Sequence, residues 1–197
     1  GLVGMLGARE GLFVLQGAEV STREEVHCLV FFENPAELEV FQEYLDDNIP
    51  AVMNDPLIFG DQVVIDEKEY IIYTEEKLLT NATNISIVEL EKYVHARGAL
   101  FIPAHIDRVR TSIYSQLGFL PEDLNADALE VSKRSTPEKF SRIHPEIKAY
   151  PLITNSDSHY PESIGTVYNC LEMKELSFGE IKMALKGIDG RRIRKKC

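Results

Sequence analysis

The sequence predicts an α/β protein built around a mostly parallel sheet or barrel. Stretches typical of strands alternate with stretches typical of helices along the 197 residues, and this order is characteristic of α/β folds. Several of the strand-like runs are continuously apolar rather than alternating, as expected of strands that are covered on both faces. A hydrophobic content of 44% and a charged content of 27% are those of a folded chain, and we expect residues 1–197 to form a single domain.

Five short runs have the composition of β-strands. They are LFVLQGAEV at residues 12–20, VHCLVFF at 26–32, ALFIPAH at 99–105, ALEVS at 128–132 and PLITNSD at 151–157. In parallel α/β folds, ligands bind beyond the carboxyl ends of the strands. The polar residues that end these runs are therefore the first candidates for a functional site.

Three predicted helices begin with the same signal, a capping side chain followed three residues later by Glu. The pairs are Asn34 with Glu37, Ser86 with Glu89, and Ser177 with Glu180. Behind Ser86 the apolar residues recur at helical spacing. Gly98 and Gly187 stand where a left-handed residue would end the second and third helices.

The stretch 54–84 differs from its surroundings because it mixes short β-prone patches with charged residues. We interpret it as an insertion within the single domain, containing a small hairpin or an extra helix. The basic run GRRIRKKC at 190–197 is interpreted as a solvated tail.

Composition excludes several classes of protein. A net charge of −11 argues against a nonspecific grip on nucleic acid, although bound divalent cations would reverse the sign of a carboxylate cluster locally. No apolar run reaches about 18 residues, so no membrane span is expected. The first ten residues lack the basic leader and long apolar core of a signal peptide, and the three cysteines form no CxxC pair. Cytoplasmic residence is the resulting expectation.

Five residues at or near the predicted strand ends are of types that bind metal ions. They are Glu19, His27, His105, Asp157 and His159. A tight hairpin could bring His27 close to Glu19, and Asp157 and His159, two residues apart in an extended segment, would share a face. Glu, His and Asp suit zinc, manganese, iron or magnesium, and a bridging carboxylate can serve two ions in phosphoryl displacement. This pattern indicates metal-assisted hydrolysis.

Each of these residues also has a structural interpretation when taken alone. His27 could be a hydrogen-bonded core histidine, Glu19 could cap a loop, and Asp157 could form an Asx turn. His95 and His144 are interpreted as ordinary surface residues. The case for a site depends on several ligand types meeting at one end of one sheet.

Arg108 lies three residues beyond His105 and is a candidate phosphate clamp, because a guanidinium group matches phosphate oxygens in a bidentate fork. Arg110 is a weaker candidate. The alternative for Arg108 is a salt bridge to Asp107 or to another nearby carboxylate.

Taken together, GAEVSTREEVHCLVFF, FIPAHIDR and ITNSDSHYPESIG resemble successive motifs of the polymerase and histidinol phosphatase (PHP) family, in order and spacing, from about residue 10 to 187. The resemblance implies a distorted (β/α)7 barrel, similar to a TIM barrel, with two or three divalent metal ions in a cleft. It implies that Glu19 bridges two ions, that His27 and His105 bind one of them, that Asp157 binds the other, and that His159 binds a third.

The chain also departs from the family pattern. The family opens with Asp-X-His-X-His and continues with Thr-Asp-His, and neither motif occurs in this sequence. We therefore expect an N-terminally incomplete form of the barrel, truncated relative to a longer protein.

The resemblance implies a metal-dependent phosphoesterase that hydrolyses a phosphomonoester, a nucleotide or an oligonucleotide end with metal-activated water, using Glu19 and Arg108 in catalysis. One alternative is a noncatalytic PHP module with a structural or interaction role. Another is an amidohydrolase-like enzyme, which would need a metal-bridging lysine, whereas Lys133 and Lys148 lie in predicted polar loops.

Overall fold

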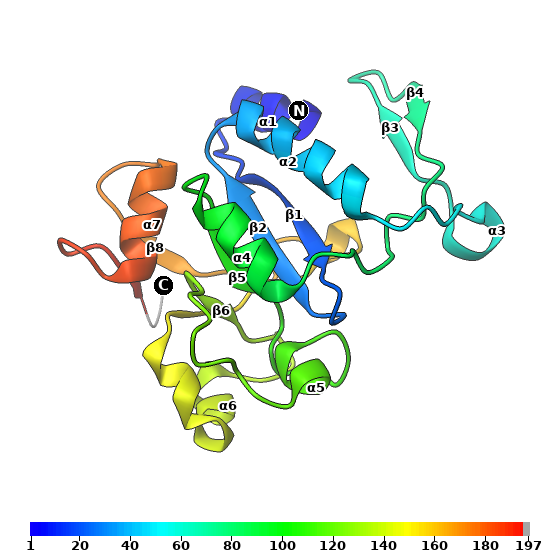
Figure 1. Cartoon of the computed structure of the whole chain (residues 1–197). Coiled ribbons are helices and arrows are strands. Elements are labelled where there is room, and N and C mark those ends of the chain that lie inside the picture. The colour runs from blue at the N-terminus through cyan, green and yellow to red at the C-terminus, as the bar shows by residue number, and fades with distance from the viewer. Residues whose placement is uncertain (195–197) are drawn as a thin grey trace.

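A three-stranded antiparallel sheet forms the centre of the protein, in a computed structural model that describes residues 1–194. Its strands lie in the order β1 (Gln16–Ser21), β2 (His27–Phe32) and β5 (Leu100–Pro103), as Figure 1 shows. The register pairs Ser21 with His27 in the first ladder and Cys28 with Pro103 in the second.

Both faces of this sheet are covered, which explains the continuous apolar run of β2. Cys28 and Val30 point toward a core shared with helices α2 (Pro35–Asn48) and α4 (Ile87–His95). Leu29 and Phe31 point to the opposite side, where helix α7 (Phe178–Lys186) completes a second core. Side chains alternate along the strand, so one strand contributes to two cores.

The prediction of a mostly parallel sheet and of a seven-stranded barrel is wrong. Within residues 1–194 the central sheet is antiparallel, the other strands form separate two-stranded sheets, and no barrel closes. The turn between β1 and β2 has only five residues, which permits antiparallel pairing alone. The long connection of residues 33–99, which includes α2 and α4, returns the chain to the sheet so that β5 pairs antiparallel with β2. A continuous apolar run shows that both faces are buried, but it does not fix the direction of the neighbouring strand.

The three predicted helix starts are confirmed. Asn34 accepts a hydrogen bond from the amide of Ala36, and Ser86 and Glu89 form a complete capping box. Ser177 caps α7, which ends at Gly187 in the left-handed conformation.

The C-terminal basic run is not a solvated tail over its described part. Arg191 is buried and forms an ion pair with Glu180, with 2.7 Å between Nη2 and Oε1. Strand β9 (Arg192–Arg194) then pairs with β8 (Cys170–Glu172). The last three residues of the run, 195–197, lie outside the described part of the chain.

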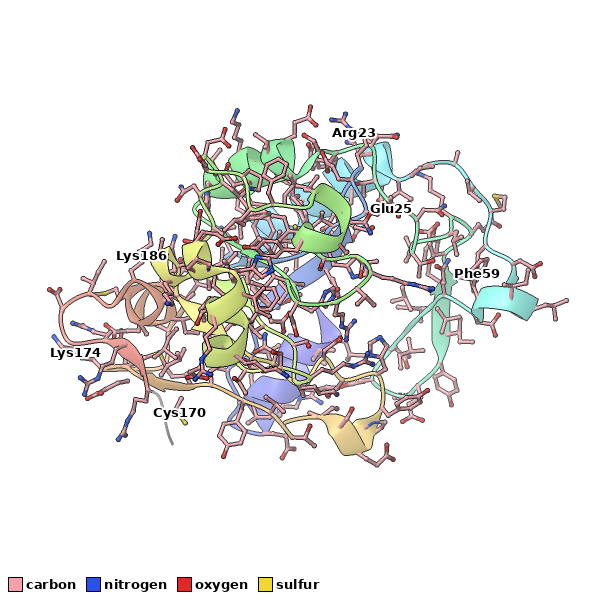
Figure 2. All side chains as sticks on the ribbon, turned by 90° about the horizontal axis from the view of Figure 1, so that it is seen from below. Arg23, Glu25, Phe59, Cys170, Lys174 and Lys186 are labelled. Carbon is pink, nitrogen blue, oxygen red and sulfur yellow. The ribbon has the colours of Figure 1, made fainter. Side chains whose placement is uncertain are left out.

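Residues 54–84 include a projecting arm, which contains both the small hairpin and the extra helix that the sequence offered as alternatives, whereas Leu78 and Thr83 near the end of the stretch are buried. The arm contains helix α3 (Pro56–Phe59) and the hairpin of β3 (Val63–Ile65) and β4 (Ile71–Thr74). Figures 1 and 2 show it extending away from the body, with Phe59 on the helix. Every residue of both strands is exposed.

The remaining elements are short. They are α1 (Leu2–Arg9), α5 (Ile113–Leu117), α6 (Pro137–Ile143), the 3-10 turns η1 (Pro145–Ala149) and η2 (Pro161–Ser163), and the parallel pair of β6 (Leu129–Glu130) with β7 (Leu152–Ile153). No helix within residues 1–194 has the length and apolar character needed to cross a bilayer.

The interpretation of His95 as an ordinary surface residue is wrong, because its ring ties α4 to the loop before β6. Nδ1 lies 2.7 Å from Glu91 Oε1, and Nε2 lies 2.9 Å from Asp127 Oδ2. Asp127 also accepts a hydrogen bond from the amide of Phe101 at the start of β5. The hydrogen bond to Asp127 raises the pKa of the His95 imidazole above its usual value of 6.5, with burial acting in the opposite direction.

This tie should make stability depend on pH. Because the pKa of His95 is higher in the folded state, its contribution is complete below about 6.5, the unfolded value, and is lost as pH rises through the folded pKa. We expect His95→Gln to lower the free energy of unfolding by about 1–2 kcal/mol near the acid end of this window and by less at higher pH. Urea unfolding of both proteins across the pH range measures the difference. A difference that is constant with pH would contradict the assignment.

Candidate metal centre

Glu19, His27 and His105 converge at one end of the central sheet. Glu19 Oε1 lies 2.6 Å from His27 Nδ1 and 3.2 Å from His105 Nε2. The potential ligand atoms of the three residues all lie within 4.8 Å of one another, and the two imidazole rings have centroids 5.2 Å apart. Residues far apart in sequence therefore meet at one point, as the sequence predicts for these three.

The hairpin of β1 and β2 places the first two ligands. Glu19 and Ser21 share one face of β1, and Ser21 pairs with His27, so Glu19 and His27 are diagonal neighbours. Gly17 allows this close pairing, because a Cβ atom there would overlap the carbonyl oxygen of Val30. The glycine of the GAE sequence thus serves the approach of the strands, and the glutamate two residues later serves the site.

The third ligand is held by its backbone. His105 follows β5 with a φ of +31°, which is unusual for a residue other than glycine. Its amide donates to Glu130 Oε2 at 2.9 Å, and the side chain is almost completely buried. Burial raises the pKa of Glu130, and the hydrogen bond from His105 acts in the opposite direction. Strain at a non-glycine residue is typical of functional sites whose surroundings fix the conformation.

The electrostatics of the cluster favour cation binding. Hydrogen bonds from His105 and then His27 hold the pKa of the Glu19 carboxyl far below its usual value, although burial opposes them. Glu19 is therefore a carboxylate across the physiological pH range. His105 Nδ1 is buried and has no hydrogen-bond partner within residues 1–194, as expected where an ion or water completes a site.

The donor set fits a divalent metal ion. Two imidazoles and one carboxylate are a known ligand set of catalytic zinc sites, in which the fourth position stays open. An ion bound by these three residues would take the place of the protons that the rings share with Glu19. The three residues could therefore hold a metal.

The structure does not bring Asp157 and His159 into this cluster. The Asp157 carboxylate forms an ion pair with Arg108 Nη2, so the salt-bridge alternative for Arg108 is confirmed, with Asp157 rather than Asp107 as the partner. The His159 side chain is 73% exposed, and its Nδ1 lies 3.8 Å from Asp157 Oδ1. The roles that the PHP resemblance implies for Asp157 and His159 remain predictions.

A cleft of about 640 Å³ adjoins the cluster. Four cationic side chains line it, namely Arg108, Arg110, Lys133 and Arg134. The amide of His27 donates to the carbonyl of Thr111, which lies in the cleft wall, so the backbone links the cluster to the cleft, although Glu19, His27 and His105 do not themselves line it. Of the two aspartates in the wall, Asp107 accepts hydrogen bonds from Ser132 and Asp157 pairs with Arg108. The cleft is thus an electropositive surface in an acidic protein.

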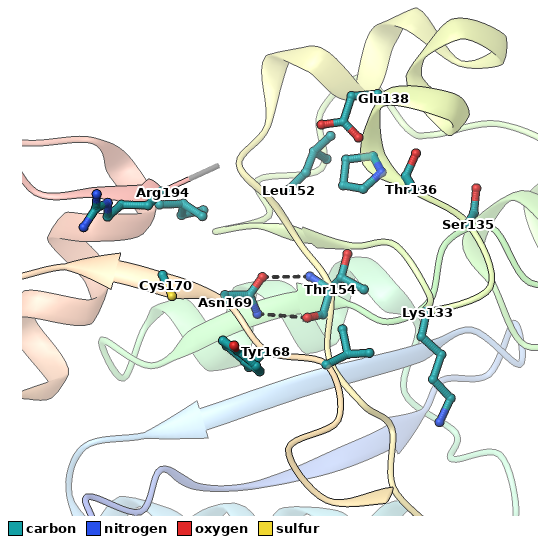
Figure 3. Close-up of a pocket in the computed structure, with 13 residues that line it drawn as sticks. Lys133, Ser135, Thr136, Glu138, Leu152, Thr154, Tyr168, Asn169, Cys170 and Arg194 are labelled. Atoms are coloured by element: carbon teal, nitrogen blue, oxygen red, sulfur yellow. Dashed lines mark hydrogen bonds between the residues drawn. The ribbon is translucent and has the colours of Figure 1, made fainter. Parts of the chain in front are cut away.

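A second cavity of about 820 Å³ shares Lys133 with the cleft but has a different character (Figure 3). Figure 3 shows the side-chain amide of Asn169 hydrogen-bonded to the backbone of Thr154. The Thr154 N–H donates to Asn169 Oδ1 at 2.9 Å, and Asn169 Nδ2 donates to the Thr154 carbonyl at 3.1 Å. Among the described residues that line it, Glu138 is the one carboxylate and none is a histidine. Its volume exceeds that of the cleft, but it lacks the side chains for metal chemistry.

Sequence reasoning missed Glu130 as a residue that supports the site. The signal was present, because Glu130 sits inside the apolar run ALEVS, where a buried carboxylate needs a specific partner. That partner is the amide of His105, twenty-five residues earlier in the chain.

We expect the protein, once freed of metal by chelation, to bind added zinc or manganese, and His105→Ala to weaken that binding. Loss of an outer partner of a ligand alone costs about 10–100-fold in affinity, so loss of a ligand should cost more than about 100-fold. Isothermal titration calorimetry measures the change. His144→Ala, outside the cluster, is the matched control and should bind as the unmodified protein does. Equal losses in both variants would contradict the three-residue centre.

No protein-family model matches the chain. The chain is 28% identical over 190 residues to the uncharacterized protein YqxK of Bacillus subtilis (strain 168). The matched region covers 91% of this chain and 43% of YqxK.

Two solved structures are similar in fold. One is the novel lesion-specific endonuclease PfuEndoQ from Pyrococcus furiosus, with a TM-score of 0.66 and 24% identity over 90% of this chain and 40% of that one. The other is Endonuclease Q in complex with a 27-mer duplex substrate with an abasic lesion at the active site, with a TM-score of 0.68 and 24% identity over 93% and 42%. The chain spans less than half the length of each of these three matched chains. It has the fold of part of the Endonuclease Q structures.

Proposed function

We propose that this chain carries the metal centre of a PHP-type phosphoesterase that cleaves phosphodiester bonds in nucleic acid. The observation that carries the proposal is the convergence of Glu19, His27 and His105 beside a cleft lined by four cationic side chains. A metal site alone would fit many hydrolases. A metal site next to unpaired guanidinium groups fits a substrate with several phosphates.

Each part of the site has a task in this proposal. A divalent ion held by Glu19, His27 and His105 would supply Lewis acidity and lower the pKa of water. Glu19 stays ionised because both rings donate to it, and Glu130 fixes the backbone of His105. The orientation of the ligands is therefore set before substrate arrives.

The cleft would bind and orient the phosphates. Arg110 and Arg134 line it, and neither forms an ion pair or a side-chain hydrogen bond with other residues in the range 1–194. Lys133 Nζ donates to the carbonyl of Ser156 at 2.7 Å, which fixes its ammonium group at the cleft wall. Against a net charge of −11, such a local concentration of cations would direct a polyanion to this place.

The structural neighbours support nucleic acid as the substrate class in preference to a small phosphomonoester. One is described as a lesion-specific endonuclease, and the other was crystallised with a DNA duplex. Because this chain covers 40–42% of those proteins, the extension of their activity to it is part of the proposal.

A noncatalytic module is the second candidate, and the Arg108–Asp157 ion pair favours it. Asp157 is occupied by Arg108, so the cluster has three ligands and no second group of ligands beside it within residues 1–194. A single ion with a structural role would be compatible with that arrangement.

Activity separates the two candidates. We expect the protein with added manganese to cleave bis(p-nitrophenyl) phosphate and a labelled DNA duplex with an abasic site, and chelation to abolish both reactions. His105→Ala and Glu19→Gln should each reduce the rate by about 100-fold or more, the scale on which preorganised electrostatic groups contribute. Arg142→Ala, on the far α6 helix, is the control and should be unchanged. Metal binding without turnover on either substrate would support the noncatalytic module.

The cleft makes its own prediction about binding. Arg110→Ala and Arg134→Ala should each weaken binding to DNA of any sequence and lower the slope of log affinity against log salt by about 1, as expected when one phosphate contact is lost. Fluorescence anisotropy at several salt concentrations measures the slope, with Arg142→Ala again as the matched control. If the salt slopes of these variants equal that of the unmodified protein, the nucleic acid binds outside the cleft.

A further inference from the structure

A second cation-lined pocket lies at the opposite end of β5 from the metal centre. It measures about 710 Å³, and its wall includes Gly98 and Ala99, immediately before β5 begins at Leu100. His105 follows the other end of the strand. A strand advances about 3.3 Å per residue, so the two sites lie roughly 20 Å apart along this path. Nothing in the metal centre accounts for this pocket.

Three lysines line the pocket, namely Lys148 of η1 and Lys182 and Lys186 of α7. The last two are four residues apart and so lie on one face of the helix. Lys182 Nζ donates to the carbonyl of Gly98 at 2.8 Å, which holds its charge at the wall. Lys148 and Lys186 form no ion pair or hydrogen bond through their side chains with any residue in 1–194. Figure 2 shows Lys186 on the side of the molecule away from the arm that carries Phe59.

The charges of these lysines are only partly balanced by the pocket wall. Among the lining residues within 1–194, Asp127 is the one carboxylate; it interacts electrostatically with Lys186 but is already engaged by His95 Nε2 and by the amide of Phe101, each at 2.9 Å. The other nitrogen of His95 contacts Glu91, so both ring nitrogens face carboxylates. In a sequence with 32 acidic and 21 basic residues, three ammonium groups around one carboxylate that is already hydrogen-bonded are unexpected.

The pocket also has the size and lining for the rest of a ligand. Its volume lies within the range of about 300–1,000 Å³ that is typical of small-molecule sites. The half-buried Tyr150 contributes a ring to the wall, with its hydroxyl fixed to the carbonyl of Leu124, and Asn125 contributes an amide. Lysines bind phosphate as point charges, and an aromatic ring with an amide suits a planar heterocycle.

We propose that this pocket is a metal-independent binding site for a phosphate-bearing small ligand of nucleotide size, with Lys148, Lys182 and Lys186 holding the phosphates. The proposal does not depend on the function proposed for the metal centre.

The test is a titration of the ¹⁵N-labelled protein with ATP and with pyrophosphate in the presence of EDTA, which removes any contribution of the metal centre. We expect saturable shifts of the amide signals of Gly98 and Asn125. The double variant Lys148→Glu with Lys186→Glu should weaken binding about 10-fold for each lysine replaced. Both side chains lack partners, so the variant should keep the amide spectrum of the folded protein. The matched control, Arg110→Glu with Arg134→Glu in the cleft, should leave these shifts unchanged.

Three outcomes would overturn the proposal. One is an absence of shifts at Gly98 and Asn125 in the unmodified protein. Another is equal binding by the lysine variant. The third is a single-stranded oligonucleotide that binds the pocket more tightly, per phosphate, than ATP, which would assign the site to a nucleic acid instead. Loss of catalysis at the metal centre would have no bearing on any of them.

Discussion

The candidate site depends on the antiparallel pairing of β1 with β2. This pairing sets Glu19 diagonal to His27, and it is close enough that Gly17 tolerates no side chain. The second strand then extends the arrangement, because the carbonyl of His27 accepts a hydrogen bond from the amide of Ala104, next to His105. One strand thus brings the first ligand pair together and positions the backbone of the third. A shift of one residue in register would turn Glu19 to the other face of the sheet.

Strand β5, at the edge of the central sheet, lies between two regions of opposite charge character. At its end, carboxylate and imidazole groups neutralise one another through short hydrogen bonds and leave a cluster that suits a cation. At its start, Asp127 and Glu91 both contact the His95 ring, and the pocket lysines form no ion pair within residues 1–194. The local charge of each region therefore depends on which carboxylates are already hydrogen-bonded. The net charge of the chain predicts the local charge of neither region.

Features that depend on local sequence were predictable, and those that depend on distant partners were not. The starts of α2, α4 and α7 and the hairpin of the arm follow from caps and patterns within a few residues. The proximity of Glu19 and His27 also followed, because a tight hairpin connection joins their strands. The direction of β5 did not, since it depends on the path of residues 33–99 between the two strands. The partners of Arg108, Glu130 and Arg191 lie between 11 and 49 residues away, and no local pattern identifies them.

The arm of residues 54–84 has a consequence for the behaviour of the protein in solution. Leu57 is 97% exposed, and apolar residues of β3 and β4 face solvent on both sides of the hairpin, whose outer edges offer free backbone groups to another strand. Seven acidic residues against two lysines accompany this apolar surface along the arm. Charges on an exposed edge act as gatekeepers against strand-to-strand aggregation. The excess of acidic residues thus serves colloidal stability here, keeping one arm from adding its strands to the next.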